Sequence, residues 1–246
     1  MSDSSRSSEY DYVGHDLDAM AVATNYYNWL LSLIEPYIHG HVAEIGAGIG
    51  TFSRQLLARQ PETLHAFEPS PQMFARLSES MAGTKNAIPV NSTIADWAQT
   101  EASRFDSVIY FNVLEHIATD TAELRSAYLS MVESAHLVVY SPALPWLYGD
   151  FDRSVGHVRR YTLAEIKAKM VDAGFEVVQA KYIDLLGVLP WYLTMVLRDG
   201  TLSLANTRRY DRWIVPLGRR LESVISPPLG KNVLAIGRKP IASHAP

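Results

Sequence analysis

An alternation of short apolar runs with helical patterns constrains the fold of this chain more than any other feature. Patterns with helical spacing occupy residues 51–59, 71–81 and 120–133. The apolar runs around them are residues 42–45, 64–67, 88–90, 107–111 and 136–140. Strands that are buried on both faces of a parallel sheet have such continuous apolar sequences. The alternation therefore predicts an α/β fold with a mostly parallel sheet and helices on both of its faces.

Two more strands are predicted towards the end of the sequence, at residues 175–183 and 232–237. A helix precedes the first of them, because Thr162 and Glu165 form a capping-box pattern. Gly174 follows at the position where a helix ends. The sheet is thus expected to have seven strands.

Three segments lie outside this alternation. The stretch 186–230 between the last two strands is much longer than a hairpin connection needs. We expect it to form an inserted helical cap, with one helix ending near Arg198 and another over residues 208–224. Residues 17–40 have a helical pattern and are expected to form an N-terminal helical lid. Residues 1–16 are rich in serine and charge, which predicts a disordered tail.

Composition excludes several classes of protein. The formal net charge of −4 offers no broad positive field for nucleic acid. The absence of cysteine excludes disulfides and thiolate zinc sites, and it suits a cytoplasmic location. The most apolar stretch, residues 185–197, is shorter than the roughly 20 residues of a transmembrane helix. Composition leaves the oligomeric state open, with a homodimer as one alternative.

The strongest local motif lies where the first predicted strand meets the first helix. Gly46, Gly48 and Gly50 allow a tight turn and let a ligand approach the backbone and the helix N-terminus. Dinucleotide sites have the spacing Gly-x-Gly-x-x-Gly, which differs from the spacing here. Glu44 places a carboxylate beside the turn, where a pyrophosphate would be repelled. The motif therefore favours a ligand other than a dinucleotide.

Acidic residues follow the next two strands. Glu68 ends the second strand, where a carboxylate can accept hydrogen bonds from two ribose hydroxyls. Asp96 follows the third strand and can accept from the amino group of adenine, while Ile94 and Trp97 can pack on the ring. Alone, Asp96 is equally well explained as a helix cap. Glu44, the glycine-rich turn, Glu68 and Asp96 follow one another in this order. Together they indicate an adenosyl ligand.

These residues resemble the motifs of class I S-adenosylmethionine (SAM)-dependent methyltransferases of the small-molecule type. The resemblance covers about residues 23–182 and the final strand, within an expected methyltransferase domain at 17–246. It implies a Rossmann-like seven-stranded sheet whose last strand is antiparallel, with SAM as cofactor and S-adenosylhomocysteine as product. The cofactor-binding residues that we predict are Glu44, Gly46, Ala47, Gly48, Gly50, Glu68, Pro69, Ile94, Asp96, Trp97, Asn112, Val113 and Tyr26.

Two histidines are candidate catalytic residues. His157 follows the fifth strand in a loop that should face the acceptor, and His116 follows the fourth. An imidazole can act as a base near neutral pH, although His116 also suits a packing or capping role. The predicted substrate-binding residues are Tyr27, Trp146, Tyr148, Arg159, Arg160, Tyr161 and Trp191.

Each of these assignments has a structural alternative. Arg159 and Arg160 can clamp an anionic acceptor, or they can pair with acidic residues of the chain. Tyr26 and Tyr27 can close over the ligands, or they can belong to the core. The sequence spacing predicts no metal site.

The sequence thus predicts a SAM-dependent methyltransferase that modifies an O, N or C atom of a small, partly hydrophobic metabolite, as in secondary metabolism. A NAD-dependent oxidoreductase is the first alternative. A SAM-binding relative that is non-catalytic or catalyses a rearrangement is the second. Lipid-linked and protein acceptors stay open.

Overall fold

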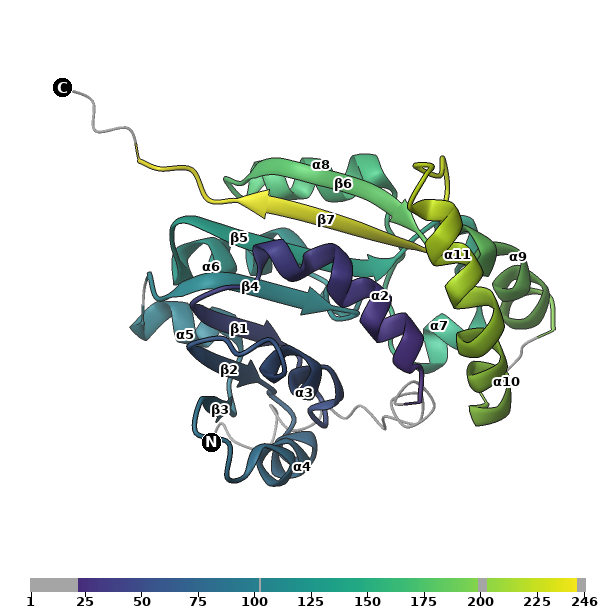
Figure 1. Cartoon of the computed structure of the whole chain (residues 1–246). Coiled ribbons are helices and arrows are strands. Elements are labelled where there is room, and N and C mark those ends of the chain that lie inside the picture. The colour runs from purple at the N-terminus through teal and green to yellow at the C-terminus, as the bar shows by residue number, and fades with distance from the viewer. Residues whose placement is uncertain (1–21, 102, 199–202, 243–246) are drawn as a thin grey trace, which may run out of the picture.

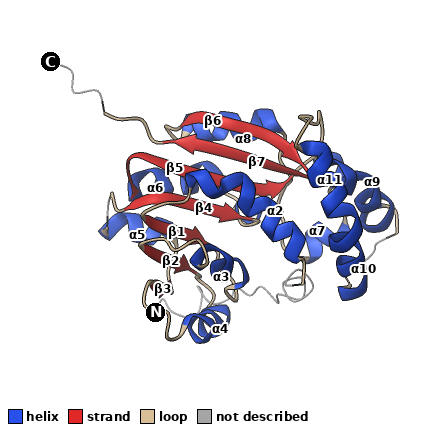
Figure 2. Cartoon of the chain, in the orientation of Figure 1, coloured by secondary structure: helices blue, strands red, loops and turns tan. Residues whose placement is uncertain are grey.

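The computed structural model describes residues 22–101, 103–198 and 203–242. Within these ranges the chain forms one seven-stranded sheet between two layers of helices (Figures 1 and 2). The expected disordered tail at 1–16, and residues 17–21 of the expected lid, lie outside the described residues.

The strands follow the predicted order closely. They are β1 (His41–Ile45), β2 (Thr63–Phe67), β3 (Ala87–Val90), β4 (Phe105–Phe111), β5 (Met131–Pro142), β6 (Glu176–Ile183) and β7 (Asn232–Arg238). The main helices are α2 (Thr24–Ile34), α3 (Thr51–Leu57), α4 (Pro71–Met81), α5 (Ile94–Thr100), α6 (Asp120–Ser130), α7 (Asp150–Ser154), α8 (Leu163–Asp172), α9 (Val188–Trp191), α10 (Leu204–Arg209) and α11 (Val215–Glu222). Short helical turns are η1 (Glu35–Tyr37), η2 (Leu114–His116), η3 (Pro145–Leu147), η4 (Leu185–Gly187), η5 (Tyr192–Val196) and η6 (Tyr210–Ile214).

The strand order is β3-β2-β1-β4-β5-β7-β6. β7 pairs antiparallel with both β5 and β6, and the pairings among β1 to β5 are parallel. This confirms the predicted Rossmann-like sheet with an antiparallel last strand. The carboxyl ends of β1, β2, β4 and β5 meet at one edge, which is where open α/β sheets bind ligands.

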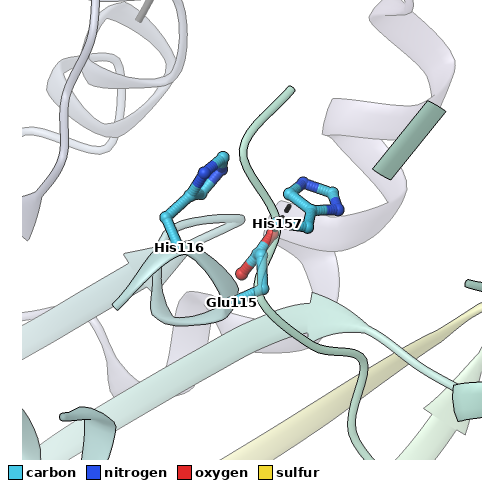
Figure 3. Close-up of side chains that lie close together, drawn as sticks. All are labelled: Glu115, His116 and His157. Carbon is cyan, nitrogen blue, oxygen red and sulfur yellow. Dashed lines mark ion pairs between the residues drawn. The ribbon is translucent and has the colours of Figure 1, made fainter. Parts of the chain in front are cut away.

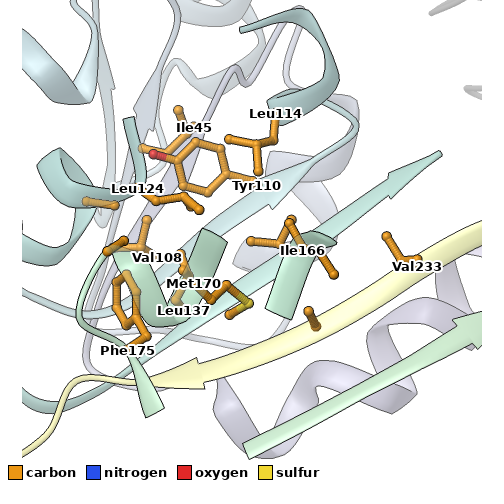
Figure 4. Close-up of a cluster of buried hydrophobic side chains, with 14 of the residues drawn as sticks. Ile45, Val108, Tyr110, Leu114, Leu124, Leu137, Ile166, Met170, Phe175 and Val233 are labelled. Atoms are coloured by element: carbon orange, nitrogen blue, oxygen red, sulfur yellow. The ribbon is translucent and has the colours of Figure 1, made fainter. Parts of the chain in front are cut away.

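Each face of the sheet carries its own hydrophobic core. On one face, Leu30 of α2, Leu56 of α3 and Leu77 of α4 are buried against β-strand residues. On the other face, Leu124 of α6 and Ile166 of α8 pack against residues such as Tyr110 (Figure 4). Burial on both faces explains why the strands are continuously apolar in sequence.

Side-chain caps mark the starts of α5, α8 and α10. The predicted capping box is present at α8, where Thr162 Oγ1 accepts from the Glu165 amide at 3.2 Å. The prediction of a helix through residue 133 was wrong, because α6 ends at Ser130 and the chain enters β5 at Met131. The pairing of this segment with β4 in the sheet therefore outweighs the helical pattern. Helix α5 had not been predicted.

The inserted cap contains two helical segments, as predicted, but their limits differ. The first runs from Leu185 to Val196 through η4, α9 and η5. The second begins at α10, earlier than expected, because Ser203 caps it by accepting from the Asn206 amide at 3.3 Å. It continues through η6 to the end of α11 at Glu222.

The cap is bonded to helix α2. Both carboxylate oxygens of Asp211 in η6 accept hydrogen bonds from backbone amides at the start of α2, from Tyr26 at 2.8 Å and from Asn25 at 3.1 Å. A carboxylate at a helix N-terminus also interacts favourably with the helix dipole. Among the helices of the described ranges, none combines the length and apolarity that a membrane span requires.

Candidate active site

The glycine-rich turn connects β1 to α3 at the ligand-binding edge of the sheet. All three glycines have positive φ, at +67° for Gly46, +57° for Gly48 and +82° for Gly50. Other residues are strained in this region of conformational space, so the path of the turn depends on glycine.

Packing adds a second requirement at two of these positions. A Cβ atom at Gly46 would lie 2.6 Å from the Val113 side chain, and one at Gly50 would lie 2.4 Å from Ser80 Oγ. We expected the glycines to make room for a ligand. The structure adds a second reason, because the side chains of neighbouring residues also leave no room for a Cβ atom.

Glu68 fastens this turn to the end of β2. Its Oε2 accepts from the Gly48 amide at 2.8 Å, and its Oε1 accepts from the Ser70 amide at 2.8 Å. Burial raises the pKa of Glu68, and these two backbone bonds oppose that rise. Each carboxylate oxygen retains a further acceptor lone pair, so the geometry fits the predicted contact with ribose hydroxyls.

Glu44 lies buried in β1 below the same turn. Burial raises its pKa to about 8; Ser53 opposes this rise, and the charge of Glu68 adds to it. Its Oε2 atom and the hydroxyl of Thr51 are buried without a hydrogen-bond partner within the described chain. Unpaired buried polar atoms are costly, so the turn is suited to a ligand that supplies hydrogen-bond donors, such as the ammonium group of SAM.

The predicted adenine-proximal residues occupy the start of α5. Asp96 is exposed, and its amide donates to Thr93 Oγ1 at 3.0 Å, so here it belongs to the cap of the helix. Ile94 is fully buried, and the Trp97 ring contacts the Phe67 ring at 5.3 Å. The structure thus gives all three residues a role in holding α5 on the sheet, beside the proposed ligand contact.

The remaining predicted cofactor residues surround the turn. The Ala47 amide donates to the carbonyl of Phe67 at 2.9 Å, and the Pro69 carbonyl accepts from Asn91 Nδ2 at 3.3 Å. Asn112 follows β4 with a φ of +53°, which aims Val113 at Gly46. Val113 therefore joins the end of β4 to the glycine-rich turn.

Tyr26 and Tyr27 are buried in α2. The hydroxyl of Tyr26 hydrogen-bonds to the hydroxyl of Tyr140 and accepts from Asn232 Nδ2 at 2.8 Å. The Tyr27 ring contacts the Phe111 ring at 5.8 Å. Both tyrosines thus belong to the core, the alternative that the sequence left open.

Both predicted catalytic histidines come together with a buried glutamate (Figure 3). The rings of His116, in η2, and His157, in the loop after α7, have centroids 4.7 Å apart. Glu115 Oε1 is buried, without a hydrogen-bond partner in the described chain, and lies 3.8 Å from His157 Nε2. The three residues form what we call the Glu–His–His cluster.

Burial determines the charge of this cluster. It raises the pKa of Glu115 to about 7, although nearby His157 lowers it. Burial and the proximity of His157 lower the pKa of His116 to about 4. His116 is therefore neutral at pH 7 and can offer a nitrogen lone pair.

Asp152 of α7 holds the loop that carries His157. Its Oδ1 lies 2.7 Å from His157 Nδ1 and accepts from Arg160 Nε at 2.9 Å. Its Oδ2 accepts from the Gly149 amide at 3.0 Å. Burial alone would raise the pKa of Asp152, but the bonds from His157 and Arg160 hold it below the usual value.

The two candidate arginines are paired within the protein. Arg160 is buried and bonded to Asp152. Arg159 is bonded to Asp120, which also accepts from the Tyr161 hydroxyl at 2.8 Å. The structure therefore favours internal pairing over the predicted anion clamp. Tyr161 itself is fully buried as part of that pairing.

The remaining candidates for acceptor contact line the same loop region. The Tyr148 hydroxyl donates to the carbonyl of His157 at 2.7 Å. Trp191 of α9 stacks under the Arg160 guanidinium at 5.0 Å, and its Nε1 lacks a partner in the described chain. Trp146 is 54% exposed, so it is accessible to a ligand.

Sequence reasoning had not selected Glu115 or Asp152 as site residues. Glu115 stands beside His116 at the end of a strand, and that adjacency was its only signal. The contact of Asp152 in α7 with His157 in the following loop spans five positions, and no pattern of hydrophobicity predicts it.

The family to which this chain belongs follows from its sequence profile. Residues 38–180 match the family model described as a methyltransferase domain, which spans more than half of the chain. The chain belongs to the methyltransferase family. A comparison of the sequence with functionally curated proteins finds no match.

Solved structures with the same fold include class I SAM-dependent methyltransferases. One from Archaeoglobus fulgidus is 17% identical, with 87% of this chain and 94% of that chain covered and a TM-score of 0.59. One from Mesorhizobium loti is 12% identical, with coverage of 85% and 95% and a TM-score of 0.60. Phosphoethanolamine N-methyltransferase 2 from Haemonchus contortus, in complex with SAM, is 14% identical, with coverage of 96% and 60% and a TM-score of 0.66.

This methyltransferase uses SAM as its methyl donor. The sheet order supports the assignment, because dinucleotide-binding folds have the parallel order 3-2-1-4-5-6 without an inserted antiparallel strand. The family match and the sheet order favour a methyltransferase over the oxidoreductase alternative. The residues around the glycine-rich turn fit a SAM molecule, since they combine a tight glycine turn, a ribose-compatible carboxylate and buried polar atoms without a partner in the described chain.

Proposed function

We propose that this methyltransferase transfers the methyl group of SAM to a nucleophilic atom of a small, partly hydrophobic metabolite. The Glu–His–His cluster carries the proposal. It joins the glycine-rich turn through Val113, two residues before Glu115. This closeness in sequence supports a position of the cluster near the methyl donor, at the ligand-binding edge of the sheet.

The reaction makes few chemical demands. SAM supplies an electrophilic methyl group on a positively charged sulfur. The accepting atom forms a bond to the methyl carbon while the carbon–sulfur bond breaks, and that electron pair stays on sulfur to give S-adenosylhomocysteine. An acceptor with a hydroxyl or ammonium group must also release a proton. The protein contributes mainly alignment, which can supply roughly 7–11 kcal/mol.

The residues of the chain divide this work. Glu44 and Glu68 hold the cofactor at the turn, and the Glu–His–His cluster receives the accepting atom and its proton. Asp152 positions His157 by fixing one ring nitrogen, so that the other nitrogen faces Glu115. Tyr148 adds a hydrogen bond to the His157 backbone and holds the loop in place.

An apolar part of the acceptor is supported by the first cap segment. Val188 and Met195 are buried, whereas Leu189, Leu193 and Leu197 are exposed at helical spacing. The segment thus presents an apolar stripe, which would otherwise lie against water. We propose that this stripe receives the hydrophobic portion of the acceptor.

Two measurements test the proposal. Isothermal titration with SAM should show binding that Glu68→Ala abolishes and that the exposed control Glu62→Ala leaves unchanged. SAM with a labelled methyl group, incubated with a cell extract, should label compounds of low mass. Label found in protein or RNA alone would refute the small-molecule acceptor.

A further inference from the structure

The Glu–His–His cluster holds a buried carboxylate with one oxygen that lacks a hydrogen-bond partner in the described chain. Glu115 is fully buried and its Oε1 has no hydrogen-bond partner within the described chain, whereas its Oε2 accepts from Ser141 Oγ at 3.0 Å. The nearest polar atom facing Oε1 in the cluster is His157 Nε2, 3.8 Å away. That separation is too long for a hydrogen bond. A buried carboxylate oxygen without a partner is costly, so the arrangement points to a missing ligand.

The contact of Asp152 with His157 favours the tautomer in which Nε2 of His157 can bind a cation. Asp152 lies 2.7 Å from Nδ1, and a carboxylate there places the proton of a neutral ring on that nitrogen. Nε2 then presents a lone pair towards the oxygen of Glu115. A divalent ion between Glu115 and His157 would bind both of these atoms.

The donor set matches that of a transition-metal site. Glu115, His116 and His157 each offer one atom, and the three atoms lie within 4.8 Å of one another. Two imidazoles and one carboxylate form a common site for zinc and for related first-row divalent ions. A carboxylate on the far nitrogen of a ligand histidine, here Asp152, is the usual outer partner in such sites.

The scaffold around the cluster fixes these residues in place. The Val158 amide donates to the Glu115 carbonyl at 2.9 Å, and the His157 amide donates to the Asp152 carbonyl at 2.8 Å. The nearby guanidinium of Arg160 is itself paired with Asp152. Tetrahedral ligands at about 2.1 Å from one ion lie about 3.4 Å apart. The three atoms, which lie within 4.8 Å of one another, would therefore need to approach by up to about 1.4 Å.

We propose that Glu115, His116 and His157 bind one divalent first-row transition-metal ion, with Asp152 as the partner that orients His157. An ion here would bind and polarise an oxygen of the acceptor, which makes an acceptor hydroxyl easier to deprotonate. This role in acceptor binding rests on the proposed function, whereas metal binding itself does not.

The experiment measures metal binding directly. Protein stripped with a chelator is titrated with Zn²⁺ by calorimetry and with Co²⁺ by visible absorption. Wild-type protein should bind one ion and show the Co²⁺ bands of a site with nitrogen ligands. Glu115→Gln and His157→Gln should each weaken binding more than tenfold, and Asp152→Asn should weaken it about 10- to 100-fold.

The chain offers a matched control. His41 Nε2 lies 3.8 Å from Glu62 Oε2, the same separation as in the cluster, but the His41 side chain is partly exposed and that of Glu62 largely exposed. His41→Gln should leave the metal affinity and the Co²⁺ spectrum unchanged. Circular dichroism and SAM binding show whether each variant is folded.

The outcomes separate the two proposals. Absence of Zn²⁺ binding by wild-type protein, or a Co²⁺ spectrum that survives both Glu115→Gln and His157→Gln, would overturn the metal site. A proton would then occupy the cluster, and SAM binding would be unaffected. Metal binding without small-molecule methylation would instead reject the proposed function and keep the metal site.

Discussion

Oδ1 of Asp152 lies 2.7 Å from Nδ1 of His157 and also accepts from Arg160, so one buried carboxylate anchors two charged or polar side chains of the following loop. The sequence separation is short, yet the contact spans the end of a helix and a reversal of the chain. The geometry of the candidate catalytic loop therefore depends on Asp152.

Replacement of this anchor should destabilise the protein. Asp152→Asn leaves the buried guanidinium of Arg160 without its charge partner, and loss of one member of a buried pair costs about 3–5 kcal/mol. Urea denaturation measures the free energy of unfolding. The neighbouring Asp150→Asn removes an exposed pair with Arg153 and should leave that free energy unchanged. Equal effects of the two variants would contradict this account.

Gly46→Ala should impair both folding and SAM binding. The variant combines backbone strain at a φ of +67° with a collision at Val113, which together cost about 2–5 kcal/mol. Gly83 has a φ of +80° and open space around its Cβ direction, so Gly83→Ala isolates the strain at about 1–2 kcal/mol. Thermal unfolding and SAM calorimetry measure both quantities. Loss of SAM affinity in Gly83→Ala would argue against a local effect at the turn.

Glu44 should make stability depend on pH. Its pKa is about 8 in the folded protein against an ordinary value of 4.5, so the folded state keeps a proton that the unfolded chain releases. The free energy of unfolding should therefore fall as the pH rises from 4.5 to 8. Glu44→Gln should flatten this slope, as measured by urea denaturation at several pH values. The exposed Glu79→Gln, with the same charge change, should retain the wild-type slope.

Asp211→Ala should loosen the start of helix α2. The substitution leaves the amides of Asn25 and Tyr26 without their acceptor, at a cost of about 1–3 kcal/mol. Hydrogen exchange at these two amides should accelerate relative to the amides of β1. Asp172→Ala, at an exposed position in α8, should change neither amide. Unchanged exchange in Asp211→Ala would show that other contacts hold the helix.

Apolar patterning was sufficient to predict the sheet, because strands that are buried on both faces must be apolar along their whole length. The glycine spacing and the placement of Glu68 likewise predicted the cofactor site that we propose, since both follow from backbone geometry next to a strand. The Glu–His–His cluster was only partly predictable. Its histidines stand at strand ends, but their meeting with Glu115 depends on how residues 150–161 fold back over η2.

The cap was predicted in outline, and its contacts were not. Helical composition indicated two segments between β6 and β7, whereas the bonds of Asp211 to α2 join positions about 185 residues apart. Such long-range pairings leave no periodic signal in a single sequence. The internal pairing of Arg159 with Asp120 escaped prediction for the same reason.

The hydrogen bonds of Asp211 couple helix α2 to the inserted cap, although these two segments lie near opposite ends of the domain sequence. Exchange of the insertion alone should therefore not transfer the preference for an acceptor from one enzyme to another. A chimaera that borrows residues 186–230 from a related enzyme would also need the donor's own leading helix. Natural exchange of acceptor specificity in this architecture would then require coordinated change at two distant stretches of the gene.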